Sequence, residues 1–344
     1  MHTKKLIAFL SIAVIGHLIF FSYNVPAQTK LKGVSGTLWA TNKTLNNVAV
    51  FDASTGEVIA TIPVGVMPIG IIAARDTGKV YVSNETSGTV SVISKETLSV
   101  ISTINLGPTT KPHHMNVSSD GQYVFVAEFG TNKIAMIDTA TDTFTLITAS
   151  SSAAARTHAC WISESGRLYA ANTVANQIAE IDVASGTILQ EITVGSNPSE
   201  VLVTANEKIA YVSVRGENKV KVVDLELGAV VDEVVVGTQP DTLRLTPDGK
   251  TLVVTLRDIT AARVSVVNVF KGLSVNTVTI TPGVTTGHHW LSQSGRYSFV
   301  AVERPGAVAV IDNRTLQVVA NYVYPGAQTD SRPHGMFYEP EPLK

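Results

Sequence analysis

The chain holds a single cysteine, Cys160, among its 344 residues. One thiol cannot form an intramolecular disulfide, which excludes a disulfide-stapled scaffold. We expect Cys160 to be buried in a strand, because exported proteins rarely expose an unpaired thiol. Charged residues are also scarce, at 16%, and the net charge is −2. Because the chain has no excess of basic residues, its composition does not indicate nucleic-acid binding.

Several catalytic signatures are absent as well. The sequence contains no glycine-rich phosphate loop, no G-x-S-x-G elbow, no H-E-x-x-H and no C-x-x-C-H. Each of these motifs places phosphate-binding, nucleophilic, zinc-ligating or haem-attaching residues at a defined spacing, so their absence argues against a site of each of these kinds. In particular, the chain carries no covalent c-type haem.

The N-terminal segment differs from the rest of the chain. Two lysines (Lys4 and Lys5) precede an apolar run over residues 6–25, and small residues surround a cleavage position after Ala27. This three-part layout is typical of a secretory signal peptide, so residues 1–27 predict export to the periplasm or the medium. The run is also close to the length of a membrane span, and an uncleaved anchor is the alternative. No cysteine stands directly after the run, which argues against a lipoprotein anchor.

The remaining sequence is repetitive. Short polar turns recur at intervals of roughly 40 to 45 residues, for example DTGK (76–79), DGQ (120–122) and DGK (248–250). An apolar strand follows each turn, and a second strand then ends in Asp, Asn or Ser, residues whose side chains bond the backbone of a following turn. Seven such units are present, each with four expected strands. Residues 28–37 would be a linker.

Radial stacking of seven four-stranded sheets predicts an all-β, seven-bladed β-propeller over residues 38–340, with a short tail at 341–344. The first unit lacks its innermost strand, and residues 334–339 form such a strand without a following partner. We therefore expect the C-terminal strand to complete the first blade and close the ring, which removes exposed sheet edges.

The segments YVSN (81–84), LYAAN (168–172) and YVSV (211–214), with the Pro240 to Gly249 spacing, resemble the YVTN-type propeller repeat family. The resemblance covers residues 38–340. It implies likeness to surface and periplasmic propellers, to lactonase-like proteins and to the haem d1 domain of nitrite reductases. Because this family is functionally mixed, the resemblance predicts the fold and gives little for the activity.

Six of the eight histidines lie where the chain enters an innermost strand; the other two are in the N-terminal segment. The loops entering these strands and the loops joining each second strand to the third form one face of the ring, which we call the top face. Four histidines occupy one repeat position facing the axis: His113, His158, His288 and His334. We expect His114 and His289 to point away from the channel, because successive side chains on a strand alternate.

Histidine is the commonest ligand for transition metals, so convergence of these rings predicts a copper, iron, zinc or nickel site, or a metallocofactor site. His113, His158, His288 and His334 are the main candidate ligands, with His114 and His289 as weaker ones. Two other interpretations stay open at this point. The histidines could form a pocket for an anionic or organic ligand, or they could bond backbone carbonyls in a structural role.

Charged residues add to the same face. Asp241 and Glu128 are weak candidates for acid–base or ligand roles. Arginines are weak candidates for holding an anionic cofactor or substrate group; these are Arg156, Arg215, Arg257 and Arg332.

The sequence therefore predicts an exported propeller with a histidine-lined site at the top of its channel. If it is an enzyme, metal-dependent redox chemistry or lactonase-like hydrolysis fits best. Its partner would be a small molecule or a protein at the top face, with membrane contact only through an uncleaved N-terminus. The alternative is a non-catalytic scaffold that binds protein or glycan through the top-face loops. The sequence leaves the oligomeric state open.

Overall fold

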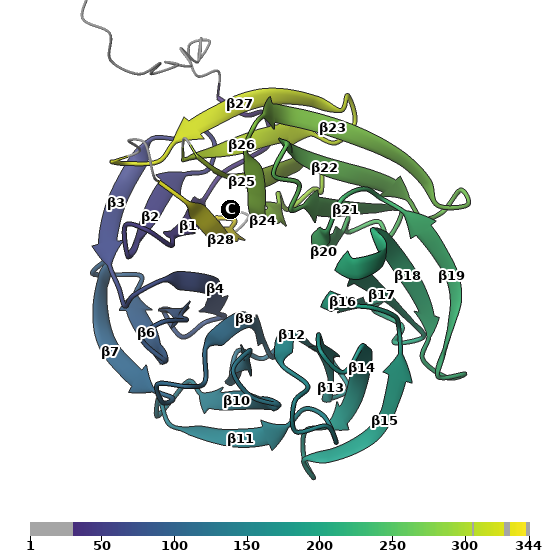
Figure 1. The fold of residues 1–344 in the computed structure, drawn as a ribbon. Coiled ribbons are helices and arrows are strands. Elements are labelled where there is room, and N and C mark those ends of the chain that lie inside the picture. The colour runs from purple at the N-terminus through teal and green to yellow at the C-terminus, as the bar shows by residue number, and fades with distance from the viewer. Residues whose placement is uncertain (1–29, 305, 327–330, 342–344) are drawn as a thin grey trace, which may run out of the picture.

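The computed structural model describes residues 30–304, 306–326 and 331–341. Over these residues the chain forms seven four-stranded antiparallel sheets arranged as blades around a central axis (Figure 1). The predicted fold is confirmed. The expected signal segment, residues 1–27, lies outside the described residues. No helix in the described part of the chain has the length and apolar character needed to cross a membrane.

The strands fall into four concentric layers, counted from the axis outward. The innermost strands are β28 (Pro333–Glu339), β4 (Pro68–Ala74), β8 (Pro112–Val117), β12 (Thr157–Ile162), β16 (Pro198–Val203), β20 (Pro240–Leu245) and β24 (Thr285–Leu291). The second layer is β1 (Thr37–Asn42), β5 (Lys79–Asn84), β9 (Tyr123–Glu128), β13 (Arg167–Asn172), β17 (Ile209–Val214), β21 (Thr251–Leu256) and β25 (Tyr297–Glu303). A short 3-10 turn, η1 (Arg215–Glu217), follows β17.

The third layer is β2 (Asn47–Asp52), β6 (Thr89–Ser94), β10 (Lys133–Asp138), β14 (Gln177–Asp182), β18 (Lys219–Asp224), β22 (Ala261–Asn268) and β26 (Ala307–Asp312). The outer layer is β3 (Val58–Pro63), β7 (Ser99–Asn105), β11 (Phe144–Thr148), β15 (Thr187–Thr193), β19 (Ala229–Val235), β23 (Ser274–Pro282) and β27 (Gln317–Val323).

Burial follows these layers. The second strands are buried along almost their whole length, as in β5, because both of their faces pack against neighbouring blades. This explains their continuous apolar sequences. The outer strands leave most residues exposed, as in β7. The turns after the third strands form as predicted: the Oδ1 of Asp52 accepts hydrogen bonds from the backbone amides of Ser54 and Thr55 at 2.8 and 2.9 Å.

Ring closure takes the predicted form. Strand β28 pairs antiparallel with β1 from Thr37 opposite Glu339 to Asn42 opposite Pro333, with a register shift between Ala40 and Asn42, so the last strand completes the first blade (Figure 1). An aromatic cluster joins the first and last blades behind this closure. Within it, the hydroxyl of Tyr324 inserts between β1 and β2, accepting a hydrogen bond from the Ala49 amide at 2.8 Å and donating one to the Ala40 carbonyl at 2.9 Å.

Every innermost strand contains a break in its ladder. The register shifts near the start of the strand in all seven blades, for example between Pro112 and Met115 in β8 and between Thr286 and His289 in β24. Such a bulge adds one residue opposite the partner strand and interrupts the alternation of side chains. Consecutive residues at the top of the channel therefore need not point to opposite sides.

The closure cluster gives a stability prediction. Tyr324→Phe removes the hydroxyl and leaves the buried amide of Ala49 without its partner, so we expect a loss of about 1–3 kcal/mol in the free energy of unfolding. Denaturant unfolding measures it. Tyr123→Phe is the control, because the structure gives the hydroxyl of half-buried Tyr123 no hydrogen bond among the described residues. Equal stability of the two variants would show that the inserted hydroxyl does not secure the closure.

Candidate functional site

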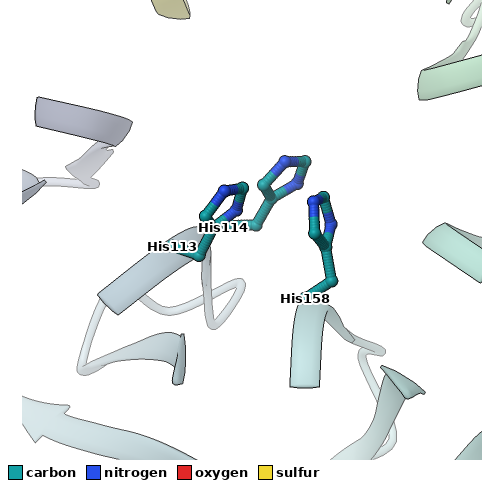
Figure 2. A group of neighbouring side chains, drawn as sticks. All are labelled: His113, His114 and His158. Atoms are coloured by element: carbon teal, nitrogen blue, oxygen red, sulfur yellow. The ribbon is translucent and has the colours of Figure 1, made fainter. Parts of the chain in front are cut away.

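Five histidines from four blades meet in the channel near the top face and form a continuous series of rings, which we call the imidazole array: His113, His114, His158, His288 and His334. The ring centres lie 4.3 Å apart for His113–His158, 5.0 Å for His113–His114, 4.2 Å for His114–His288 and 4.3 Å for His288–His334. Figure 2 shows His113 and His114 leaving one strand and turning toward His158 of the next. All five rings are buried.

His114 does not lie where alternation along a strand would place it. Its ring stacks on that of His113, with 7° between the planes, and reaches His288 on a blade that is not a neighbour of its own. The bulge in β8 explains the difference, because it lets two consecutive side chains enter the channel. The expectation that His114 faces away from the channel is therefore wrong.

His289 does lie outside the array. Its Nδ1 is 2.8 Å from the Oγ1 of Thr242 on the neighbouring blade, and its ring is fully buried. Burial, with Arg244 nearby, lowers the pKa of His289 to about 3. It is an inter-blade residue, in keeping with the alternation expected from the sequence.

Four of the imidazoles in the array are electrically neutral. Burial in the channel, reinforced by neighbouring charges, holds the pKa of four of its histidines well below the usual range: His113, His158, His288 and His334. Neutral imidazole is the form that binds metal ions, because a ring nitrogen must offer its lone pair.

The partners of His158 fix its tautomer. Its Nδ1 lies 2.7 Å from the carbonyl oxygen of Ser199, which only accepts, so Nδ1 carries the proton. Its Nε2 therefore holds the lone pair, and the Nη2 of Arg215 donates to it at 3.1 Å. Arg215 also pairs with the buried carboxylate of Asp241. The guanidinium thus bridges a neutral ring and an anion.

Asp241 is the axis-facing residue of β20 and is fully buried. Burial alone would raise its pKa, but Arg215 and then Arg257, whose Nη1 is 3.5 Å away, outweigh burial and hold it well below the usual range. Asp241 is therefore an ionised counter-charge beside the array, and it has no proton to give at neutral pH.

His334 has a comparable arrangement. Its Nδ1 donates to the Oε1 of Glu303 at 2.8 Å, and the Nζ of Lys43 donates to the same oxygen at 2.5 Å. The lone pair of His334 is then on Nε2. A carboxylate that orients a ring in this way is a common feature around metal-ligating histidines.

Three ring nitrogens of the array are buried without a hydrogen-bond partner in the described part of the chain: Nδ1 of His113, Nε2 of His114 and Nε2 of His288. The Nε2 of His289, outside the array, is a fourth. Buried polar atoms are nearly always satisfied, so each of these requires an explanation. One ligand atom from each of His113, His114 and His158 lies within 4.8 Å of the others. The array therefore concentrates unused nitrogen donors in a small volume.

The remaining predicted residues lie apart from the array. Glu128 is buried at the end of β9, where its Oε2 accepts a hydrogen bond from Thr131 at 2.8 Å, and burial raises its pKa. The guanidinium of Arg156 is exposed and lies 5.7 Å from the centre of the Phe129 ring. Arg332 is half-buried, and its backbone amide bonds the Oδ1 of Asn42.

Two channel residues, Lys43 and Glu85, were not predicted. Each directly follows its second strand, the position that Arg215 and Arg257 occupy in their own blades. Lys43 pairs with Glu303, and the Oε2 of Glu85 lies 3.8 Å from the Nε2 of His113. Aligning the repeats would have identified both residues, because residues at the same repeat position of a closed ring lie at the same level of the channel.

These observations define the class of the protein: a seven-bladed β-propeller whose channel is crossed by buried imidazoles. The sequence model of the YNCE-like beta-propeller family matches residues 4–228, and the chain belongs to that family. None of the curated proteins compared with the chain matches it.

Solved structures share the fold. A functionally unknown protein from Desulfotomaculum acetoxidans DSM 771 superposes with a TM-score of 0.72 at 16% identity, covering 88% of this chain and 99% of that one. Dihydro-heme d1 dehydrogenase NirN in complex with DHE gives 0.63 at 17% identity, covering 88% and 75%. The Cps50 (Swd1) propeller domain of Myceliophteria thermophila gives 0.63 at 14% identity, covering 75% and 87%. At these identities the likeness is one of fold.

The buried neutral histidines predict acid sensitivity. Their pKa values are lowered on folding, so below the usual histidine value of about 6.5 the unfolded chain binds protons that the folded chain does not. Stability should therefore fall as the pH decreases from about 6.5 to 5, above the range in which ordinary carboxylates titrate. Each such histidine contributes up to about 1.4 kcal/mol per pH unit.

The measurement is denaturant unfolding of the metal-free protein at a series of pH values. His334→Gln removes one site of proton uptake, so its stability should depend less steeply on pH than that of the wild type. An unchanged slope would mean that His334 titrates normally in the folded protein.

Proposed function

We propose that the imidazole array binds a transition metal ion and that the protein works outside the cytoplasm. The single observation that carries the metal proposal is the set of unpartnered, buried ring nitrogens on three histidines of one continuous array. Imidazole nitrogen suits copper, iron, zinc and nickel, and a metallocofactor held through its metal would use the same donors.

The donor set fits a metal after a small contraction. In a tetrahedral site with metal–nitrogen bonds of about 2.0–2.1 Å, the nitrogens lie roughly 3.3 Å apart. Donor atoms of His113, His114 and His158 spread over 4.8 Å would have to move inward. Arg215 would have to release the Nε2 of His158. The carboxylate of Asp241 would still balance the positive charge of Arg215. His288 and His334 lie next in the array as further ligands.

The chemistry would follow from the metal. Copper or iron supports small-molecule redox reactions, whereas zinc or nickel with an open position supports hydrolysis of a lactone-like substrate. Glu303 and the Ser199 carbonyl support either case, because they fix the tautomers of His334 and His158 and leave Nε2 lone pairs for binding.

The metal proposal is tested on protein from residue 28 onward, loaded with copper, iron, zinc or nickel, dialysed and analysed by plasma mass spectrometry. We expect about one ion per chain, and at least a tenfold loss of affinity in His114→Ala, because His114 joins the two halves of the array. His289→Ala is the matched control, since His289 is equally buried but lies between blades. It should bind like the wild type.

A wild-type protein that stays empty after loading would overturn the metal proposal. The second candidate function, a scaffold that binds protein or glycan through the top-face loops, would then lead. Exposed apolar side chains in those loops favour it: Ile259 is 82% exposed and Val174 52%.

Export is supported by residues 1–27 alone. We expect the mature chain to begin at Gln28 and to be released from cells by osmotic shock or into the medium. Intact-mass analysis of fractionated cells would decide the point. A full-length chain in the membrane fraction would indicate the uncleaved anchor instead, and a full-length chain in the cytoplasm would contradict export.

A further inference from the structure

A second site lies in the channel beyond the imidazole array. A cavity of 620 Å³ is lined by residues from all seven innermost strands and opens on the face opposite the top face. Its lining residue closest to the top face is Glu200, whose Oε1 is 3.8 Å from the Nδ1 of His114. The volume lies in the usual range for small-molecule sites, roughly 300–1,000 Å³.

Aromatic side chains form much of the wall. Trp161 and Trp290 line the cavity together with Phe337, and all three are only half-buried. The rings of Trp290 and Phe337 meet edge to face at 5.2 Å. Trp161 packs against a core cluster containing Leu202, and Trp290 against one containing Ile72. Large, half-buried rings that pack against neighbouring apolar residues suit a flat apolar ligand.

Arg244 supplies the polar end of the wall. Its guanidinium lies over Trp290, 4.6 Å from the ring centre, and its Nη1 donates to Glu200 at 2.9 Å and to the Leu243 carbonyl at 2.6 Å. Its Nε is buried with no partner among the described residues, and its Nη2 makes no hydrogen bond there either. A stacked guanidinium with an unused N–H is ordered in advance to bind an acceptor.

The other charged groups of the cavity indicate whether its ligand carries a positive or a negative charge. Glu200 already accepts from Arg244 and from the Leu243 amide, and Glu339 at the mouth pairs with Lys95 at 2.6 Å. Arg75 is exposed at the same mouth, and no ion pair involves it in the described part of the chain. The unused hydrogen-bonding capacity is therefore that of donors, which favours an anion.

We propose that this cavity binds an aromatic carboxylate, with the ring system between Trp161 and Trp290 and the carboxylate on Arg244. The proposal goes beyond the metal function and does not depend on it, because none of these side chains belongs to the imidazole array. A planar carboxylate matches the fork of a guanidinium, and a bicyclic ring matches the aromatic wall.

The test uses 2-naphthoate as the ligand and metal-free protein. Calorimetric titration should show one site per chain, and binding should change the tryptophan fluorescence, since two of the three tryptophans line the cavity. Trp161→Leu should weaken binding at least tenfold. Arg244→Lys keeps a charge beside Glu200 but loses the planar donors, so it should weaken 2-naphthoate about tenfold while leaving neutral 2-naphthalenemethanol unchanged.

Arg263→Lys is the matched control, because Arg263 pairs with Asp258 at 2.5 Å outside the cavity. It should bind 2-naphthoate like the wild type, and thermal unfolding of each variant shows whether it is folded. Absence of saturable binding by the wild type would overturn the proposal. Undiminished binding in folded Trp161→Leu and Arg244→Lys variants would overturn it equally, since the ligand would then lie elsewhere.

Discussion

Closure of the ring by pairing of β28 with β1 is the constraint on which the rest of the structure depends. An open row of blades would leave strand edges unpaired and would place equivalent residues of the repeat along a line. A closed ring brings the same residues to one level of one axis. His158, Asp241 and His334 are separated by scores of residues, yet each enters the channel because each holds the same place in its own innermost strand. A repeat with no local metal motif can therefore build a site from many blades.

The channel combines two ways of burying polar groups. His113, His158, His288 and His334 are buried in the neutral form, which avoids the large free-energy cost of burying a charge. The charges near them are buried in pairs: Asp241 with Arg215, and Glu303 with Lys43. Removing one member of such a pair leaves the other uncompensated, at a cost of several kcal/mol. Because of this coupling, an alanine variant of Arg215 or Glu303 would change the stability of the fold as much as the binding of a metal. The Nε2 of His114, in contrast, has no hydrogen-bond partner among the described residues, so its removal breaks no such bond.

The sequence predicted the fold well because the signals for the fold are local. Each turn after a third strand has its Asp, Asn or Ser, and each second strand its apolar run, so the four-stranded unit could be recognised seven times. The concentration of histidines was equally clear. The placement of His114 was not, because the bulge in β8 comes from the geometry of the ladder and overrides the alternation that sequence spacing implies. Lys43 and Glu85 were predictable in principle, since they share the repeat position of Arg215. The aromatic cavity could not be predicted from the sequence, because Trp161 and Trp290 are far apart in the chain and belong to no recognisable motif.

The two proposed sites divide the channel between them, and Glu200 lies at the boundary. It lines the aromatic cavity, pairs with Arg244 there, and lies 3.8 Å from His114. A ligand drawing the guanidinium of Arg244 toward itself would loosen one partner of Glu200 and leave the Leu243 amide as a donor to its carboxylate, while the Nδ1 of His114, at 3.8 Å, lies beyond hydrogen-bond distance. A carboxylate that accepts from one nitrogen of an imidazole strengthens the other nitrogen as a metal ligand. The unpartnered nitrogen of His114 is that other nitrogen, Nε2. The fold thus places a carboxylate of the proposed cavity next to the ring that joins the two halves of the array, and closure of the 3.8 Å gap between them would connect occupancy of the cavity with the proposed metal site.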